Sequence, residues 1–151
     1  MKQTIESAAI KVRLACAADA DELVSLCEQL GYPSTLSEIK DRLARLDGNS
    51  ENALFVSEDN NGRLTGFIGL SARPLIVCDL AVEVTALVVD RKARGKGVGK
   101  RLLEEADEWS RERGAKMITL RSNVIREEAH KFYLHLGYEI YKTSLAFRKK
   151  L

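Results

Sequence analysis

A strand pattern that passes through a basic, glycine-rich loop into a helix pattern constrains this chain more than any other feature. Residues 83–89 are rich in β-branched side chains, residues 94–100 contain three glycines and three basic residues, and residues 101–109 place apolar side chains at helical spacing. The first amides of a helix have no intrahelical acceptor, and glycines let a ligand approach the backbone closely. Because basic side chains stand beside those amides, the segment predicts a site for a ligand that carries phosphate.

Two common phosphate motifs do not fit this loop. A Walker A loop ends in Gly-Lys-Ser or Gly-Lys-Thr, whereas Arg101 follows Gly99 and Lys100 here. A dinucleotide fingerprint has the spacing G-x-G-x-x-G early in a strand–helix–strand unit. The glycines of this loop are spaced G-x-G-x-G and lie past the midpoint of the chain. Both motifs are therefore rejected, and a plain surface turn stays open as the alternative to a phosphate site.

A third motif fits. Residues 94–99 form the pattern R-x-x-G-x-G, which is similar to the acetyl-CoA signature of the GCN5-related N-acetyltransferase (GNAT) superfamily. That signature follows a Leu-x-Val strand, which residues 87–89 supply. A second family element begins with Asn123 and continues as AHKFYLHLGY over residues 129–138. With both motifs in the family's order, the resemblance covers nearly the whole chain.

The resemblance implies a single α+β domain over residues 1–151, with a mixed α/β sheet that carries helices on both faces. Local patterns agree: an i, i+3, i+4, i+7 stripe ends at Gly31, and a Thr-x-x-Glu capping box at residues 35–38 starts the next helix. Asp19 or Asp21 is expected to cap the first helix. One parallel strand pair is expected, between the strand before the glycine loop and the strand after the following helix. Strands are predicted at 10–15, 53–58, 64–72, about 80–89, 117–120 and 138–148 (one or two strands), and helices from the glycine loop to Gly114 and near 127–136.

The resemblance also implies acetyl-CoA as cosubstrate, bound where two parallel strands splay apart. Its pantetheine arm would bond to the backbone of Leu87 and Val89, and the Val89 amide would polarise the thioester carbonyl as an oxyanion donor. The pyrophosphate would lie on the amides of residues 95–100, and Asn123 would hydrogen-bond the pantetheine or order the cleft. The expected cofactor-binding residues are Leu87, Val88, Val89, Arg94, Gly95, Lys96, Gly97, Val98, Gly99, Lys100, Asn123, Ala129 and His130.

Two side chains are candidates for acid–base chemistry. Tyr133 is the candidate general acid, because the resemblance gives the tyrosine of its motif the role of protonating the departing thiolate. The alternative for Tyr133 is a core residue on an apolar helical stripe. Glu83 is the candidate general base, on a strand face expected to include Leu87 and Val89. A salt bridge is the alternative for Glu83, and Asp79 is a weaker candidate for the base.

The acceptor is expected to be the primary amine of a small molecule, attacking acetyl-CoA directly in a ternary complex. The run 122–133 looks closest to aminoalkylphosphonate acetyltransferases, and it also resembles aminoglycoside and other small-amine acetyltransferases. A protein lysine or N-terminal acceptor, or an acetyl-CoA-binding module without catalysis, stays open. The resemblance builds the acceptor pocket from the first two helices and residues 73–80. There Lys40, Arg42 and Arg45 would meet an anionic substrate, unless they form a solvated helix face.

Composition sets further limits. A net charge of +2 is too small to argue for nucleic acid, and no apolar run approaches the ~20 residues of a membrane span. Three cysteines without C-x-x-C spacing, and an N-terminus without an apolar signal segment, indicate reduced thiols in the cytoplasm. His130 and His135 are spaced i, i+5, which is not a metal-ligand pairing, so no metal is expected. The resemblance makes a small amine the expected partner. A homodimer stays open as the assembly.

Overall fold

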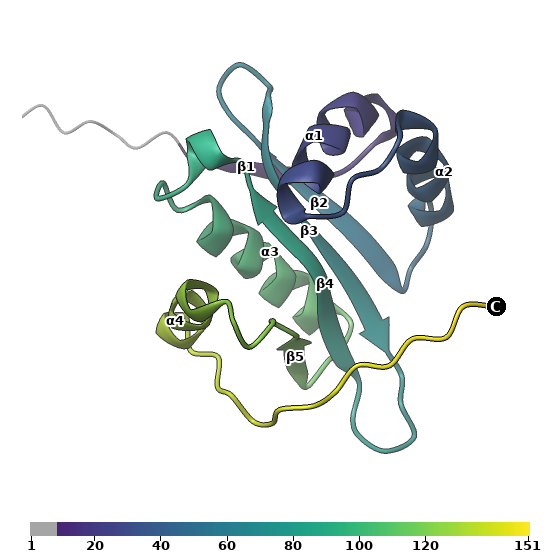
Figure 1. The fold of residues 1–151 in the computed structure, drawn as a ribbon, viewed down its shortest axis with the longest axis vertical. Coiled ribbons are helices and arrows are strands. Elements are labelled where there is room, and N and C mark those ends of the chain that lie inside the picture. Colours follow the sequence, from purple (N-terminus) through teal and green to yellow (C-terminus); the bar gives the residue numbers. More distant parts are fainter. Residues whose placement is uncertain (1–8) are drawn as a thin grey trace, which may run out of the picture. The chain divides into compact units, whose positions relative to one another are not determined.

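The computed structural model describes residues 9–151, which fall into two compact units. The N-terminal unit ends at Leu120, and the C-terminal unit comprises Arg121–Leu151. The single domain predicted over residues 1–151 stays a prediction, and residues 1–8 lie outside the described part. Figure 1 shows the elements, which are β1 (Lys11–Leu14), η1 (Ala17–Asp19), α1 (Ala20–Leu30), α2 (Leu36–Leu46), β2 (Asn52–Glu58), β3 (Leu64–Arg73), β4 (Ala81–Val89), η2 (Arg91–Ala93), α3 (Val98–Glu112), β5 (Met117–Leu120) and α4 (Glu127–His135).

The N-terminal unit contains a mixed sheet with the strand order β1-β2-β3-β4-β5. Strands β1 to β4 pair antiparallel, whereas β4 and β5 run parallel. The β2–β3 hairpin closes where sequence predicted it: Asp59 Oδ1 accepts the N–H bonds of Asn61 at 2.8 Å and Arg63 at 3.0 Å. The predicted mixed sheet, with one parallel pair within residues 9–120, is confirmed.

Helices cover both faces of this sheet (Figure 1). On one face, Leu23 of α1 and Leu43 of α2 belong to the same buried cluster as Phe67 of β3. Gly66 is the neighbour of Phe67 and so faces the opposite way. A Cβ atom on Gly66 would lie 3.3 Å from Leu102 Cδ1 of α3. Helix α3 therefore packs on the other face, as the prediction of helices on both faces requires.

The helix ends show how local signals set these elements. Helix α2 begins with the predicted capping box: Thr35 Oγ1 accepts the Glu38 N–H at 3.2 Å, and Glu38 Oε2 accepts the Thr35 N–H at 2.9 Å. Helix α1 ends at Gly31, whose φ of 96° is left-handed. Asp19 stands at the N-cap position of α1 but makes no capping bond there. Its carboxylate bonds to other residues. The predicted position of Asp19 at the start of α1 is therefore confirmed, and the predicted capping hydrogen bond is wrong.

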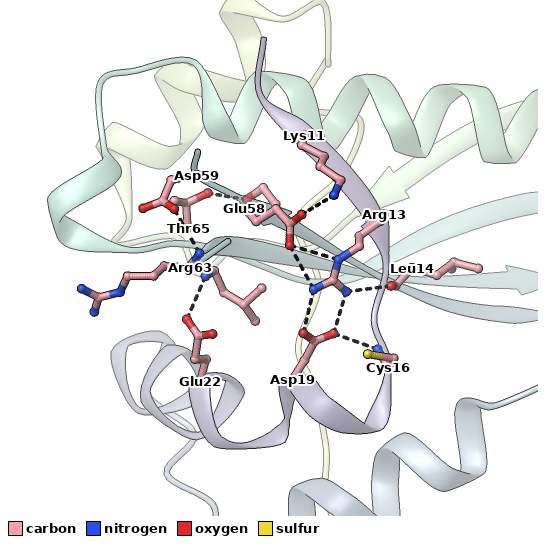
Figure 2. Close-up of polar contacts among 12 residues, drawn as sticks. Lys11, Arg13, Leu14, Cys16, Asp19, Glu22, Glu58, Asp59, Arg63 and Thr65 are labelled. Atoms are coloured by element: carbon pink, nitrogen blue, oxygen red, sulfur yellow. Dashed lines mark hydrogen bonds and ion pairs between the residues drawn. The ribbon is translucent and has the colours of Figure 1, made fainter. Parts of the chain in front are cut away.

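The Asp19 carboxylate belongs to an ion cluster that joins β1, η1 and β2 (Figure 2). Arg13 donates to both Asp19 oxygens at 2.8 Å and to Glu58 Oε2 at 3.1 Å, and Lys11 pairs with Glu58 at 2.6 Å. The hydrogen bond from Arg13 lowers the pKa of Asp19, and the one from Lys11 lowers the pKa of Glu58. The side chains of both acids are largely buried. The cluster therefore fixes the short edge strand β1 to the rest of the sheet.

Arg13→Met should lower the free energy of unfolding by about 2–3 kcal/mol, because it leaves the buried Asp19 carboxylate without its cationic partner. A lowered carboxyl pKa contributes stability above about pH 5 that is lost as the pH falls through that pKa. The difference between the wild type and the variant should therefore shrink on acidification. Urea unfolding at about pH 7 and about pH 3 measures both effects. Arg45→Met, on the exposed face of α2, is the control; an equal loss in both variants would contradict the role given to the cluster.

The C-terminal unit contains α4 and an extended tail. Helix α4 ends near the predicted residue, since Gly137 has a φ of 90° and the Tyr138 N–H donates to Tyr133 O at 3.1 Å. The strands predicted at 138–148 are wrong: the structure has no strand in residues 138–151. That segment is rich in β-branched and aromatic side chains, but a strand also needs a partner for its N–H and C=O groups. Among the described residues, none bonds through its backbone to the backbone of 139–151.

Candidate functional site

Strand β4 has a backbone edge that β5 leaves open. The parallel pairing ends with Val84 opposite Leu120, whereas β4 continues to Val89. The N–H of Asp90 donates to β3 at 2.8 Å. Because backbone groups alternate in direction along a strand, Leu87 and Val89 direct theirs away from β3. The edge thus offers ladder groups with which an extended ligand can pair.

The loop after β4 carries the chain from this edge to the N-terminus of α3. Gly95 and Gly97 have φ values of 75° and 85°, a region that L side chains disfavour, and Gly97 is the N-cap residue of α3. A Cβ atom on Gly95 would meet no atom within 4 Å. The Arg94 Nε atom donates to the Val89 carbonyl at 3.2 Å, which ties the loop to the end of β4. Glycine is therefore favoured at position 95 by its backbone conformation and not by crowding from other residues. The space beside Gly95 is open.

The start of α3 has the properties of an anion site. The first helical bond to Gly97 O comes from Arg101 N–H at 3.0 Å, so the amides of residues 98–100 have no acceptor within the helix. The positive end of the helix dipole lies at the same point. Arg94 and Lys96 are exposed beside it. The structure therefore brings the predicted phosphate-binding residues 94–100 together in one turn.

A β-bulge at Thr85 decides which β4 residues share a face. Glu83 and Ala86 oppose two β3 residues that are only two positions apart, so Thr85 is an extra residue in β4. Ala86 packs against the core under α1 and α2, and Glu83 lies on that same face. Leu87 and Val89 lie on the opposite face. The prediction that Glu83 shares a face with Leu87 and Val89 is therefore wrong, because the inserted residue reverses the alternation.

The bulge has a signal in β3 that the sequence analysis missed. A glycine inside a strand often marks a bulge or a close backbone approach, and Gly69 stands in the middle of β3. A Cβ atom on Gly69 would lie only 2.6 Å from Thr85 Oγ1. Gly69 is thus the residue that makes room for the bulged threonine.

Glu83 forms an ion pair that the sequence analysis allowed as the alternative to a base. Its Oε2 atom lies 2.8 Å from Arg73 Nε at the end of β3, and 15% of the Glu83 side chain is exposed. Arg73 was not singled out from the sequence, because its pairing with Glu83 depends on the register of β3 against β4. The ion pair holds the carboxylate in place, and the role of Glu83 as a base stays a prediction. Asp79, the weaker candidate, is exposed in the loop between β3 and β4.

A cavity of about 440 Å³ lies between α1, α2 and the same face of the sheet. Its walls are mainly apolar, and they include Tyr32 after α1 and the β4 residues Thr85 and Ala86. Of the three basic α2 residues considered for an anionic substrate, only Arg42 lines it. Residues of α1 and α2 therefore line a cavity, whereas residues 73–80 do not line it; its use as the acceptor pocket stays a prediction.

The predicted residues of the C-terminal unit form their own cluster. Asn123 Oδ1 accepts the Ile125 N–H at 3.2 Å, and the Asn123 carbonyl lies 2.9 Å from His130 Nε2. The Tyr133 ring makes edge-on contacts with Phe132 and Tyr138, at centroid distances of 5.3 and 5.7 Å. Burial raises the pKa of Tyr133, and the positive charge of Arg126 opposes that rise. Asn123 and His130 are thus brought together, while the role of Tyr133 as the general acid stays a prediction.

Two kinds of feature are absent from residues 9–151. No helix there is long and apolar enough to cross a lipid bilayer. No three His, Cys, Asp or Glu residues of that part gather into a set that could hold a metal ion.

An open strand edge beside a glycine-capped helix N-terminus, within a mixed sheet, is the arrangement that the resemblance predicted for an acyltransferase. The profile of the Acetyltransferase (GNAT) family matches residues 9–138. The chain belongs to this family and is a GNAT N-acetyltransferase. The predicted family and the predicted enzyme class are confirmed.

Individual relatives agree with that assignment. The aminoalkylphosphonate N-acetyltransferase of Salmonella typhimurium is 33% identical over 133 residues, which cover 85% of this chain and 84% of that protein. A GNAT family acetyltransferase from Staphylococcus aureus is 26% identical with a TM-score of 0.76, over 95% of this chain and 99% of that chain. The aminoglycoside N-acetyltransferase AAC(6')-Iy, solved with the bisubstrate analogue CoA-S-monomethyl-acetylneamine, is 18% identical with a TM-score of 0.83, over 95% of this chain and all of that chain. These likenesses confirm the predicted fold.

Proposed function

We propose that this enzyme transfers the acetyl group of acetyl-CoA to the primary amine of a small molecule, by direct attack in a ternary complex. The observation that carries the proposal is the open β4 edge at Leu87 and Val89, which continues into the glycine loop and the N-terminus of α3. An extended arm can pair with that edge like an added strand, and a diphosphate can accept the amide bonds of residues 95–100. The CoA-linked analogue bound to AAC(6')-Iy supports the same donor for this chain.

Several groups of this chain would hold the donor. The Val89 amide donates to the thioester carbonyl oxygen, where negative charge develops as the amine attacks. The amides of 95–100 and the charges of Arg94 and Lys96 hold the pyrophosphate. In the C-terminal unit, Asn123, which His130 contacts, would hydrogen-bond the pantetheine. The conformations of Gly95 and Gly97 fit this role, because neither places a side chain between the ligand and the backbone.

The acceptor amine would enter from the face of β4 that carries Glu83. Glu83 takes a proton from the bound ammonium group, directly or through water, which leaves the neutral amine to attack, and Arg73 keeps the carboxylate oriented. The amine nitrogen bonds to the thioester carbon, and the carbon–sulfur bond breaks as Tyr133 gives its phenolic proton to the departing thiolate. The nitrogen loses its second proton in the same collapse, and that proton returns to Tyr133 directly or through water. The aminoalkylphosphonate acetyltransferase among the relatives supports a small amine as acceptor.

We place the enzyme in the cytoplasm, because its three cysteines are free thiols, as a reducing compartment would keep them.

The proposal is tested by incubating the purified enzyme with acetyl-CoA and a panel of amines. The panel includes an aminoalkylphosphonate, an aminoglycoside, simple alkylamines and a lysine peptide. Release of CoA thiol and the mass of the N-acetyl product are both recorded. We expect turnover with a small amine above the rate with the peptide. Peptide acetylation alone would replace the proposed acceptor, and acetyl-CoA binding without any product would favour a module without catalysis.

Glu83→Gln should lower kcat/KM about 100-fold near neutral pH, because it removes a proton acceptor while keeping the shape of the side chain. The loss should shrink at high pH, where more of the amine is already neutral. The pH profiles of the wild type and the variant measure this. Asp79→Asn separates the two candidate bases, since only the acting base should give a loss that depends on pH. A pH-independent loss in Glu83→Gln would instead indicate a binding or electrostatic role.

A further inference from the structure

The cavity between α1, α2 and the sheet has a mainly apolar lining with a single charged residue. Its volume of about 440 Å³ lies within the usual range of small-molecule sites. Leucine side chains such as Leu23, Leu30 and Leu43 form the helix walls, and Phe67 forms part of the floor. None of the twelve described residues that line it is aspartate or glutamate. A ligand that fills this cavity therefore has an apolar body.

Arg42 is the one charged residue among those twelve. Its Nη1 atom donates to Ser34 Oγ at 2.7 Å, and no carboxylate in residues 9–151 makes an ion pair with it within 4.0 Å. Glu38, one turn earlier in α2, uses its carboxylate to cap that helix. Burial raises the pKa of the Cys27 thiol, which also lines the cavity, and the charge of Arg42 opposes that rise. Arg42 is exposed, and its charge acts both on Cys27 in the cavity lining and on Glu38 outside it.

The β4 and α2 parts of the cavity lining differ in chemistry. Thr85 and Ala86 line it from the β4 bulge, immediately before the strand edge proposed to hold the acetyl donor. Glu83 lies on that same face of β4. Arg42 and Leu46 line the cavity from α2. An amine at the bulge would therefore share the cavity with apolar walls and with one guanidinium group.

We propose that Arg42 determines the substrate specificity of this cavity, so that it selects an amine whose apolar spacer leads to one anionic group, a carboxylate or a phosphonate, bound by Arg42. The inference rests on the proposed function and narrows its substrate class. A guanidinium group pairs well with either anion through charge-assisted hydrogen bonds. A polycationic aminoglycoside is disfavoured, since the cavity lining gives its further ammonium groups no carboxylate and places Arg42 against them.

The test compares 4-(aminomethyl)benzoate with its uncharged analogue 4-methylbenzylamine, which keeps the amine and the ring and replaces the carboxylate by a methyl group. Acetylation is measured for the wild type, Arg42→Gln and Arg45→Gln. Arg45 is also exposed on α2 but does not line the cavity, so it is the matched control. We expect the wild type to prefer the carboxylate probe by about 10- to 100-fold in kcat/KM, the range of a charge-assisted hydrogen-bonded pair. Arg42→Gln should remove the preference and Arg45→Gln should keep it.

Calorimetric binding of the two probes separates this inference from the proposed function. Tighter binding of the carboxylate probe that depends on Arg42, without acetylation of any amine, would support the cavity assignment and contradict the transferase proposal. Acetylation of both probes with equal kcat/KM, or a preference that survives in Arg42→Gln, would overturn the inference and leave the transferase proposal standing. Kanamycin as a better acceptor than either probe would overturn it as well.

Discussion

Gly97→Val is expected to abolish acetyl-CoA binding in a protein that remains folded. Gly97 is the N-cap residue of α3 with a φ of 85°. Holding a valine in that left-handed conformation costs about 1–3 kcal/mol. A domain of this size tolerates such a cost. The added side chain would stand where the proposed pyrophosphate meets the backbone. We expect a wild-type Kd in the micromolar range, and a loss of at least about 100-fold in the variant, which isothermal titration calorimetry would detect.

The matched control for that experiment is Gly114→Val. Gly114 has a φ of 73° and, like Gly97, no crowding atom near the position of its Cβ. It follows the C-terminal end of α3, about 20 Å from Gly97 along the helix. Both variants therefore carry the same kind of backbone strain, and only one carries it at the proposed anion site. Acetyl-CoA binding of wild-type strength in a folded Gly97→Val protein would overturn the assignment of the loop.

The features of this chain that sequence predicted correctly are those set by local signals. The capping box of Thr35 and Glu38 and the stop at Gly31 each depend on a few neighbouring residues, and the structure has them at the expected places. The glycine loop is local in the same sense, because its turn and the start of α3 lie within a few consecutive residues, and its role in binding phosphate stays a prediction. These elements required no knowledge of the neighbouring strands.

The features that sequence reasoning missed depend on residues far apart in the chain. The face of Glu83 is set by the bulge at Thr85, and that bulge is visible only in the register of β4 against β3. The partner of Glu83 is Arg73, ten positions earlier and across the same ladder. The predicted strands at 138–148 failed for a related reason, because strand propensity forms no ladder without a partner. Pairing partners, rather than local preference, decide all three.

The bulge also gives the proposed reaction a geometry. Leu87 and Val89 offer their backbone groups along the edge of β4, whereas Glu83 and Ala86 lie on the face under α1 and α2, where Ala86 lines the cavity. Without the extra residue, the alternation of the strand would turn Glu83 toward α3. The bulge therefore lets one strand present backbone donors for the acetyl group and a carboxylate for the amine from different sides. This division is what a ternary complex needs, because donor and acceptor must be bound at the same time.

Tyr133→Phe is expected to lower kcat by about 10²–10⁴-fold with little change in acetyl-CoA affinity, because it removes the proton that the proposed mechanism gives to the thiolate. The contacts of the ring with Phe132 and Tyr138 survive the substitution, so the fold should be kept. Tyr141→Phe, at an exposed tyrosine of the same unit, is the matched control.

The pH profile gives Tyr133 a second test. Burial raises the pKa of Tyr133 above its ordinary value of 10.0, so the phenol keeps its proton throughout the neutral and mildly alkaline range. The proton donor is lost only as the pH rises through that raised pKa, and wild-type kcat should therefore show no fall attributable to Tyr133 below about pH 10. Loss of activity in Tyr133→Phe should be of similar size throughout that range, in contrast to the shrinking loss expected for Glu83→Gln. A Tyr133→Phe enzyme with the full rate would assign Tyr133 to packing, and the thiolate would then leave without an acid from this residue.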